Sequence, residues 1–313
     1  MAYSNIESEL DTGGVVILDG GTGTELERRG VPMDDGAWCG PATLDHLAVL
    51  KAVHRDYIRA GADIITANTF ASSPLMLGPA DLDDRFEEIN RAAIQTAHRA
   101  KEASGRADVA VAGSLSHMIP LVEGTDRSDL DRAPSFAAMR DALDRLASLH
   151  KEEGCDLILL EMMYHPDRMA PAFEAALATG LPVWAGFSAR RGDDGRVLSF
   201  TREQDIPFEV ILQVLNDFEV AAAGIMHTEV NTITDALPIL QSVYQGPVMA
   251  YPDSGYFKMP NWQFDAIIPP DEFRQFADKW VASGAQIVGG CCGLSPDHIR
   301  AIASIKRSRA RHR

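Results

Sequence analysis

The sequence predicts a single α/β domain, a (β/α)8 TIM barrel, and three observations predict it. Short apolar runs alternate with longer amphipathic segments along all 313 residues. The apolar runs are rich in Val, Ile, Ala and Leu without polar alternation, as in parallel strands buried on both faces. No Pro/Ser-rich linker divides the chain, and barrels of about 250 residues commonly form one domain.

Eight segments have the strand pattern, and in chain order they are 15–20, 63–70, 108–114, 156–162, 182–188, 220–226, 247–251 and 286–290. Between them, apolar residues recur every three or four positions, which is typical of amphipathic helices. Several of these segments begin with Ser, Thr or Asp, the residues that cap helix N-termini, and the first ends at Gly61. The predicted helices are 43–60, 83–104, 135–153, 167–179, 208–216, 271–282 and 296–305.

The predicted domain has a core of about 13–305, followed by a basic, solvated tail at 306–313. An open, doubly wound sheet is the alternative architecture. It usually has fewer strands and often a second domain, and no boundary in this sequence marks one. We therefore expect one closed barrel over the whole chain.

Charge and cysteine content narrow the class of protein. The chain has 29 Lys and Arg against 45 Asp and Glu, a net charge of −16, which disfavours nucleic acids and anionic membranes as partners. No apolar stretch approaches the ~20 residues that span a bilayer, and the N-terminus lacks the cations of a signal peptide. Two of the four cysteines are adjacent, which favours reduced thiols. We expect a soluble, cytoplasmic protein and leave open whether it is a homo-oligomer.

The barrel prediction also locates the active site, because catalytic residues of this fold lie at the carboxyl ends of the strands. Among the polar residues at these strand ends, Asn68 and Ser254 are candidates for substrate binding. The full set at the strand ends is Asp19, Asn68, Ser114, Glu161, Ser188, His227, Asp253, Ser254, Cys291 and Cys292.

Cys291 and Cys292 follow the last predicted strand and have glycines on both sides. Glycine allows the chain to turn so that both sulfurs face one centre. Two converging thiolates repel each other and need a cation, and zinc prefers such ligands. The alternative is that both are small buried hydrophobic residues beside a turn. We predict a zinc site.

A third ligand must come from another strand end, and His227 follows the sixth predicted strand. A lone histidine is often only a hydrogen-bonded structural residue, and Glu229 or water remain alternatives for this position. Three protein ligands with one open position are the pattern of catalytic zinc. We therefore predict that His227 completes the site.

Two acidic residues are candidates for binding substrate. Asp19 begins a glycine-rich turn that matches neither common phosphate-binding motif, so Gly20 is expected to let the backbone approach a ligand closely. Glu161 follows four apolar residues, and a buried carboxylate needs a cation such as a substrate ammonium group. A helix cap or an internal salt bridge is the alternative for each acid.

Trp38 and Phe70 lie on predicted loops above the barrel mouth. Aromatic faces attract sulfonium and quaternary ammonium groups by about 2 kcal/mol when water is excluded. Packing within the loops is the alternative interpretation. We predict that both residues contact a cationic ligand.

Five blocks of the chain together resemble one family, the homocysteine S-methyltransferases, which include betaine- and S-methylmethionine-dependent enzymes. The blocks keep the family's order, and the resemblance covers about 13–305. It implies a (β/α)8 barrel, one zinc ion bound in part by Cys291 and Cys292, an amino-acid acceptor held by Asp19 and Glu161, and a donor facing Trp38 and Phe70. The blocks are LDGGTGTELERRG (18–30), GADIITANTF (61–70), VAGS (111–114), YPDSG (251–255) and GAQIVGGCCG (284–293).

This sequence departs from the family pattern at three places. The family's third zinc cysteine belongs to a Gly-x-Asn-Cys phrase, which here reads Gly-Ile-Met-His and ends at His227. Asp253 stands where asparagine is common, and Met162 where a small hydroxyl residue is usual. A His/Cys/Cys site has one negative charge fewer than a three-cysteine site, which makes the ion a stronger Lewis acid.

We therefore predict a zinc-dependent methyltransferase whose partners are a small thiol, with homocysteine favoured, and a cationic methyl donor. No D-x-H-x-x-G phrase is present, so no resident cobalamin is expected. Two alternatives remain open at this point. One is a barrel lyase or hydrolase that uses the carboxylates at the strand ends, and the other is a metal-free, non-catalytic binding protein.

Overall fold

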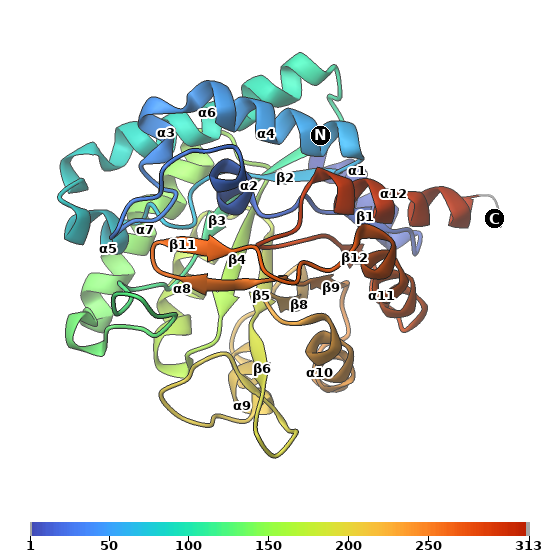
Figure 1. Cartoon of the computed structure of the whole chain (residues 1–313). Helices are drawn as coiled ribbons and strands as arrows, with labels where there is room; N and C mark the ends of the chain where they lie inside the picture. The colour runs from blue at the N-terminus through green and yellow to red at the C-terminus, as the bar shows by residue number, and fades with distance from the viewer. Residues whose placement is uncertain (1, 311–313) are drawn as a thin grey trace.

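The computed structural model describes residues 2–310, with side chains through 306, and its central feature is a parallel barrel (Figure 1). The eight strands follow the order β1-β12-β9-β8-β5-β4-β3-β2. A parallel bridge between Leu18 and Ile64 joins the first strand to the last, so the sheet closes. The strands are β1 (Val16–Ile17), β2 (Ile64–Thr66), β3 (Ala110–Leu115), β4 (Leu157–Met163), β5 (Val183–Phe187), β8 (Ala222–Met226), β9 (Val248–Tyr251) and β12 (Ile287–Val288).

Each barrel strand falls inside or within one residue of a segment predicted from the sequence, and the predicted (β/α)8 fold is confirmed. The polar strand-end residues consequently lie at one end of the barrel, as the carboxyl ends of parallel strands must.

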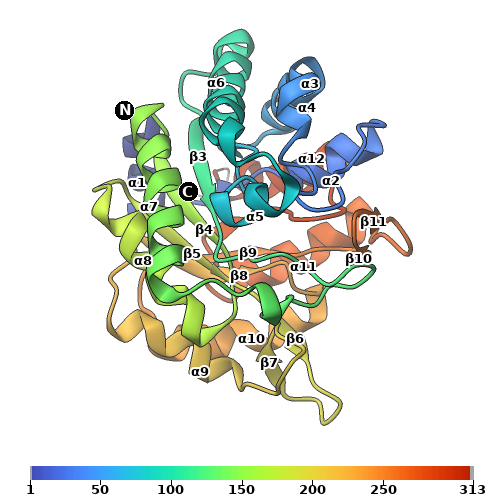
Figure 2. The same ribbon diagram turned by 90° about the vertical axis from the view of Figure 1, so that its left-hand side faces the viewer.

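Most helices surround the barrel, as Figures 1 and 2 show from two directions. The predicted helix 43–60 is divided at His46 into two helices, and the predicted 83–104 and 208–216 each contain a 3-10 segment. The helices and 3-10 segments that correspond to predictions are α3 (Ala42–Asp45), α4 (Leu47–Ala60), η2 (Asp83–Arg85), α6 (Phe86–Ser104), α7 (Phe136–Glu152), α8 (Pro166–Ala178), α9 (Phe208–Leu212), η4 (Gln213–Asn216), α11 (Pro270–Ala282) and α12 (Pro296–Ala310).

Four further helices were not predicted from the sequence: α1 (Ala2–Asp11), α2 (Thr22–Arg28), α5 (Pro74–Leu77) and α10 (Val230–Val243). The glycines around α2 and the internal Pro238 of α10 disguise the helical pattern. Two short 3-10 segments, η1 (Gly78–Ala80) and η3 (Leu130–Arg132), lie in loops.

Helix α1 packs against the interior of the barrel at the amino-terminal ends of the strands. Ala2, Ile6 and Leu10 are four residues apart, so they share one helix face, and all three are buried with the side chains that fill the barrel. The buried Trp184 donates its indole N–H to the Tyr3 hydroxyl at 3.1 Å. This spacing of four was the only sequence signal for the helix. The helix lies at the end of the barrel opposite the predicted active site.

Two antiparallel hairpins extend from the carboxyl ends of the strands: β6–β7 (Ala189–Arg191 and Val197–Ser199) and β10–β11 (Tyr256–Lys258 and Asn261–Gln263). Hairpin β10–β11 lies beside α2 in Figures 1 and 2, and Glu27 of α2 accepts a hydrogen bond from the Trp262 backbone at 3.0 Å. Neither hairpin was predicted. Hairpin β10–β11 brings Phe257 and Trp262 to the barrel mouth, and Phe200 directly follows β7.

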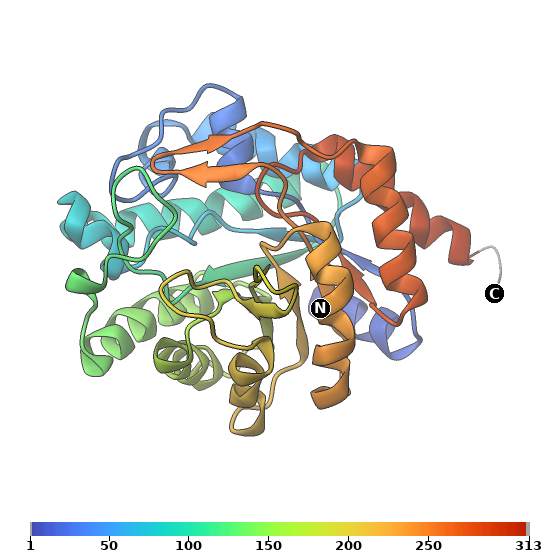
Figure 3. The same cartoon turned by 60° about the horizontal axis from the view of Figure 1, so that its bottom comes forward.

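Helix α12 packs alongside α11 and runs to Ala310, five residues beyond the predicted boundary (Figure 3). Residues 306–310 of the predicted tail therefore continue a helix, and Lys306 contacts the Asp63 carboxylate at 3.0 Å. Residues 311–313 of that prediction lie outside the described residues. Among residues 2–310, no helix combines the length and the apolar character needed to cross a bilayer.

A buried histidine of α4 makes stability depend on pH. His54 is fully buried, neither ring nitrogen has a hydrogen-bond partner among the described residues, and burial lowers its pKa to about 4. The folded state therefore keeps His54 neutral, whereas the unfolded chain binds a proton below its ordinary pKa of 6.5. Stability present above pH 6.5 is lost as the pH falls toward 4, by about 1.4 kcal/mol per pH unit.

We expect His54→Met to remove this loss. Between pH 7 and 4.5, the free energy of unfolding should fall by about 2–3 kcal/mol less in the variant than in the wild type. Urea titrations at both pH values measure it. Identical pH dependence in both proteins would show that His54 is not the acid-sensitive group.

Candidate active site

A cavity of about 900 Å³ opens at the carboxyl ends of the barrel strands. The structure places every predicted site residue on its wall, although these residues come from strand ends spread along the whole chain. The predicted residues that line it are Asp19, Gly20, Trp38, Asn68, Phe70, Glu161, His227, Ser254, Cys291 and Cys292.

The loop of the two cysteines is fixed by backbone contacts with neighbouring strand ends. Cys291 donates its backbone N–H to Pro252 at 2.7 Å, and the Cys292 carbonyl accepts from the Ser254 N–H at 2.9 Å. Gly293 has a φ of 80°, and a Cβ there would lie 1.9 Å from the Ser254 carbonyl oxygen. Only glycine fits this position, and the resulting turn directs both sulfurs toward the cavity.

His227 lies directly after β8 with a φ of 43°, a left-handed conformation that is uncommon for a residue other than glycine. Its backbone N–H is held by the Tyr251 carbonyl at 3.2 Å. Its Nδ1 lies 3.5 Å from Cys291 Sγ, and one ligand atom from each of His227, Cys291 and Cys292 lies within 4.8 Å of the others. The three predicted ligands therefore converge.

The electrostatics of this cluster favour a cation. Burial lowers the pKa of His227, but the Asp253 carboxylate and the Cys291 sulfur outweigh it and raise the value to about 9. The hydrogen bond to Cys292 and burial raise the pKa of Cys291 well above the ordinary range of a thiol. Two adjacent thiolates are thus strongly disfavoured unless a positive charge lies between them.

Asp19 is buried and bound on both oxygens. The Thr66 backbone N–H donates to Oδ2 at 2.7 Å, and the Thr66 hydroxyl donates to Oδ1 at 2.9 Å. Burial outweighs these bonds and raises the pKa of Asp19 to about 7. Thr66 was not among the predicted site residues, because nothing in sequence spacing indicates that β2 would hold the carboxylate of the β1 end.

Glu161 lies in an irregular part of β4, where the register with β5 shifts between Leu160 and Met163. Such bulges redirect side chains, and here Met162 has a φ of 54° while the Glu161 carboxylate lines the cavity. The Ser114 hydroxyl donates to it. Burial raises the pKa of Glu161 to about 7. Both acids therefore gain from a cationic ligand, which would favour their charged forms.

Asn68 has its polar atoms occupied by the loop that carries Trp38. Its amide nitrogen donates to the Cys39 carbonyl at 2.9 Å and to the Thr43 hydroxyl at 3.2 Å, while its oxygen accepts from the Cys39 thiol at 3.3 Å. In this arrangement Asn68 orients the loop. Ser254 similarly accepts from the Ile268 N–H at 2.9 Å.

Gly20 lies against other backbone rather than open space. A Cβ there would come within 2.4 Å of the Leu294 carbonyl and 2.8 Å of the Tyr57 ring. The glycine therefore lets the turn after β1 pack closely on the loop that follows β12. It also lines the cavity.

Aromatic residues form one side of the cavity. Trp38 packs edge-on against Phe70, with ring centroids 6.3 Å apart, and against Phe257 of the β10–β11 hairpin at 5.7 Å. Trp262 of the same hairpin and Phe200 flank His227 at 5.7 and 5.4 Å. Sequence reasoning found Trp38 and Phe70 but missed the other three. The signal for Phe257 and Trp262 was weak: several aromatic residues on either side of a short turn at 259–260.

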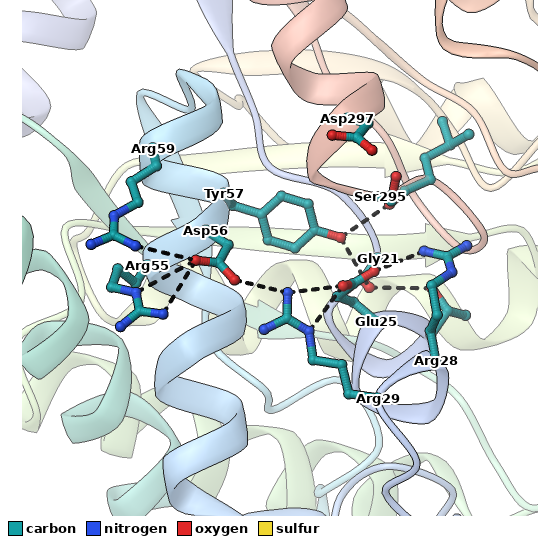
Figure 4. A network of polar contacts seen from close by, with 12 residues as sticks. Gly21, Glu25, Arg28, Arg29, Arg55, Asp56, Tyr57, Arg59, Ser295 and Asp297 are labelled. Atoms are coloured by element: carbon teal, nitrogen blue, oxygen red, sulfur yellow. Dashed lines mark hydrogen bonds and ion pairs between the residues drawn. The ribbon is translucent and has the colours of Figure 1, made fainter.

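A polar network surrounds Glu25 of α2, the helix that follows the turn after β1 (Figure 4). Glu25 of α2 is buried and binds Arg28 at 2.7 Å and Arg29 at 2.9 Å, and Arg29 continues to Asp56 of α4 at 3.0 Å. Arg28 also donates to the Gly293 carbonyl at 2.9 Å. The network therefore links α2 and α4 with the loop that carries the cysteines.

Comparisons with known proteins point to one family. A model of the family described as homocysteine S-methyltransferase matches residues 16–305. The chain is 28% identical to a selenocysteine Se-methyltransferase of Brassica oleracea var. italica, covering 96% of this chain and 91% of the relative. It is 27% identical to homocysteine S-methyltransferase 2 of Arabidopsis thaliana, covering 93% and 92%.

Solved structures show the same fold. The oxidized form of the Escherichia coli homocysteine methyltransferase MmuM superposes with a TM-score of 0.77 at 25% identity, over 96% of this chain and 99% of that one. Its metallated form has a TM-score of 0.75 at 22% identity, over the same shares of the two chains.

Proposed function

The chain belongs to the homocysteine S-methyltransferase family, and from this premise we propose that it methylates a thiol held at a zinc site formed by His227, Cys291 and Cys292. The family makes the chain a methyltransferase and disfavours the lyase, hydrolase and non-catalytic alternatives. Homocysteine is the proposed acceptor, and a sulfonium or quaternary ammonium compound is the proposed donor. The observation that carries the metal assignment is the convergence of one nitrogen and two sulfurs within 4.8 Å.

The donor set fits zinc in chemistry and in spacing. Two ligands of a tetrahedral zinc ion, at about 2.3 Å for sulfur and 2.1 Å for nitrogen, lie about 3.6 Å apart. Cys291 Sγ and His227 Nδ1 are separated by 3.5 Å. The wide cavity beside them leaves room for a fourth ligand. A bound zinc ion would keep the acceptor sulfur as a thiolate at neutral pH.

The acidic residues are suited to hold the acceptor by its amino group. Asp19 and Glu161 lie on the same cavity wall as the proposed metal ligands, and the negative charge of Glu161 makes ionisation of Asp19 more costly. An ammonium group between them removes that cost. They would then orient the acceptor so that its sulfur points toward the cysteine loop.

The aromatic wall is suited to hold the donor. Trp38, Phe70 and Phe257 present rings to the cavity, where a sulfonium or ammonium group gains from their faces. In the transfer, a bond forms between the acceptor sulfur and the methyl carbon while the bond from that carbon to the donor sulfur or nitrogen breaks. The donor leaves neutral, and the acceptor's thiol proton goes to solvent. The cavity contributes alignment of the two reactants.

The direct test is methionine formation from homocysteine with zinc-loaded protein and a panel of sulfonium and ammonium donors. We expect product from at least one donor, loss of product after removal of zinc by a chelator, and recovery when zinc is returned. A zinc-loaded protein that makes no methionine with any donor would contradict the proposal.

The aromatic wall leads to a further expectation. Trp38→Ala should raise the donor KM by about 30-fold, which corresponds to about 2 kcal/mol, because a desolvated cation–π contact is lost. Trp38→Phe keeps a ring and should have a smaller effect. Initial rates with each substrate varied in turn measure this. An equal rise in the acceptor KM would place Trp38 outside a donor-specific site.

A further inference from the structure

The two ring nitrogens of His227 face two different groups. Nδ1 lies 3.5 Å from Cys291 Sγ, and Nε2 lies 3.8 Å from the Asp253 carboxylate oxygen Oδ2. An imidazole that binds a metal through Nδ1 must carry its proton on Nε2. A carboxylate at Nε2 stabilises that form, as carboxylates do for many metal-binding histidines.

The position of Asp253 relative to the cysteines is fixed by the backbone on both sides of it. Its neighbour Pro252 accepts the Cys291 N–H at 2.7 Å, and its other neighbour, Ser254, donates to the Cys292 carbonyl at 2.9 Å. The carboxylate therefore lies on a segment that two backbone hydrogen bonds join directly to the cysteine loop. The Asp253 and His227 side chains are 16% and 9% exposed, so solvent screens their attraction little.

The remaining neighbours of the imidazole do not determine its orientation. Phe200 and Trp262 pack edge-on against the ring at 5.4 and 5.7 Å, with interplanar angles of 68° and 66°. These rings limit tilting, but a half-turn of the imidazole about its Cβ–Cγ bond would keep the same shape between them. Such a half-turn would carry the two nitrogens away from Cys291 and Asp253. Of the contacts described, only the polar ones distinguish the two orientations.

We propose that Asp253 is a positioning residue that holds His227 with Nδ1 toward the two cysteines and thereby strengthens metal binding. This inference rests on the proposed zinc site. Asp253 does not itself belong to the converging ligand set, and it acts through His227. We expect its 3.8 Å contact to shorten into a hydrogen bond when the ion binds, because metal binding makes the Nε2–H a stronger donor.

The proposal predicts that the effect of Asp253 depends on the residue at position 227. Beside an imidazole, the carboxylate should favour zinc. Beside a thiolate, the carboxylate has no N–H from which to accept a hydrogen bond. A further negative charge next to three thiolates should add little or nothing to zinc affinity. This dependence separates positioning of His227 from a general attraction of the carboxylate for the cation, which would operate with either residue.

The experiment measures zinc affinity by competition with a chromophoric chelator. Asp253→Ala and Asp253→Asn are compared in the native chain and in His227→Cys. In the native chain, we expect Asp253→Ala to weaken zinc binding about 10- to 100-fold, with a smaller loss for Asn, whose amide oxygen still accepts a hydrogen bond. In His227→Cys, the same substitutions should change affinity less than about threefold or strengthen it.

Two controls and one spectroscopic readout keep the outcome interpretable. Asp265 also lines the cavity, and Asp265→Ala should leave zinc affinity unchanged. Nitrogen-15 NMR of the zinc-loaded protein with labelled histidine should show Nδ1 coordination by His227 in the wild type and mixed Nδ1 and Nε2 coordination in Asp253→Ala. Metal-free thermal midpoints report whether each variant folds.

Equal zinc affinity in wild type and Asp253→Ala would overturn the role of Asp253 while leaving the zinc site intact. An equal loss in both backgrounds would replace positioning with simple electrostatic attraction and would also overturn it. A wild-type chain that holds no zinc would instead refute the proposed function, and this inference with it.

Discussion

Replacing Cys291 by alanine is expected to abolish zinc binding and to lower kcat/KM for methyl transfer by more than about a thousandfold, or about 4 kcal/mol. The reason is that Cys291 belongs to the proposed set of three ligands, and its Sγ lies 3.5 Å from His227 Nδ1. Without this sulfur, two ligands remain, and the acceptor thiol keeps its ordinary pKa of about 8.5, so little of it is thiolate at neutral pH.

The matched control is Cys155→Ala. Cys155 is a buried free cysteine that precedes β4 and does not line the cavity, so its loss perturbs packing without touching the proposed ligands. Zinc per chain after dialysis, measured by atomic emission, and methionine formation are the two readouts. Full zinc content in Cys291→Ala, or loss of zinc in Cys155→Ala, would contradict the assignment.

Glu161→Gln is expected to raise the acceptor KM by about 100-fold while changing the donor KM little. The carboxylate is half-buried and accepts a hydrogen bond from the Ser114 hydroxyl, so its remaining lone pairs are available to a ligand in the cavity. A buried ion pair with a substrate ammonium contributes about 2–3 kcal/mol, and glutamine supplies no charge for it. Glutamine keeps the size of the side chain and an oxygen that accepts from Ser114.

The pH profile gives an independent check on Glu161. In the free enzyme its pKa is raised to about 7 by burial, and only the ionised carboxylate attracts an ammonium group. Acceptor kcat/KM should therefore rise with pH through about 7 and then level off. Asp19 also has a pKa raised to about 7, so Glu161→Gln should make this rise shallower rather than remove it. An unchanged profile with an unchanged KM would exclude Glu161 from acceptor binding.

The barrel could be predicted from sequence because each strand has a recognisable local pattern of apolar residues. The first four residues of β4, 157–160, are apolar on both faces, and the glycines that end helices, such as Gly61, mark the transitions to the strands. The strand ends follow from these runs, so the position of the cysteine pair at the barrel mouth followed as well. Helix α1 was missed because three apolar residues spaced by four are a weak signal in ten residues.

Elements with atypical composition were missed for a related reason. Helix α2 contains Gly23, and the space for a Cβ there is filled by Trp38 and Cys39, so the glycine serves tertiary packing and not a flexible loop. Hairpin β10–β11 consists of two three-residue strands joined by a two-residue turn at 259–260. Such short strands leave no periodicity to detect, yet this hairpin brings Phe257 and Trp262 to the cavity.

The sequence contains the residue types that the proposed methyl transfer to a thiol needs: adjacent cysteines and a histidine at strand ends, two acids and loop aromatics. What only the tertiary structure decided is which atoms face each other: Thr66 on Asp19, Ser114 on Glu161, and Asp253 on the far nitrogen of His227. The reason is that hydrophobic periodicity specifies burial along one strand. Contacts between strand ends depend instead on barrel closure, bulges and single left-handed residues, which leave almost no local pattern.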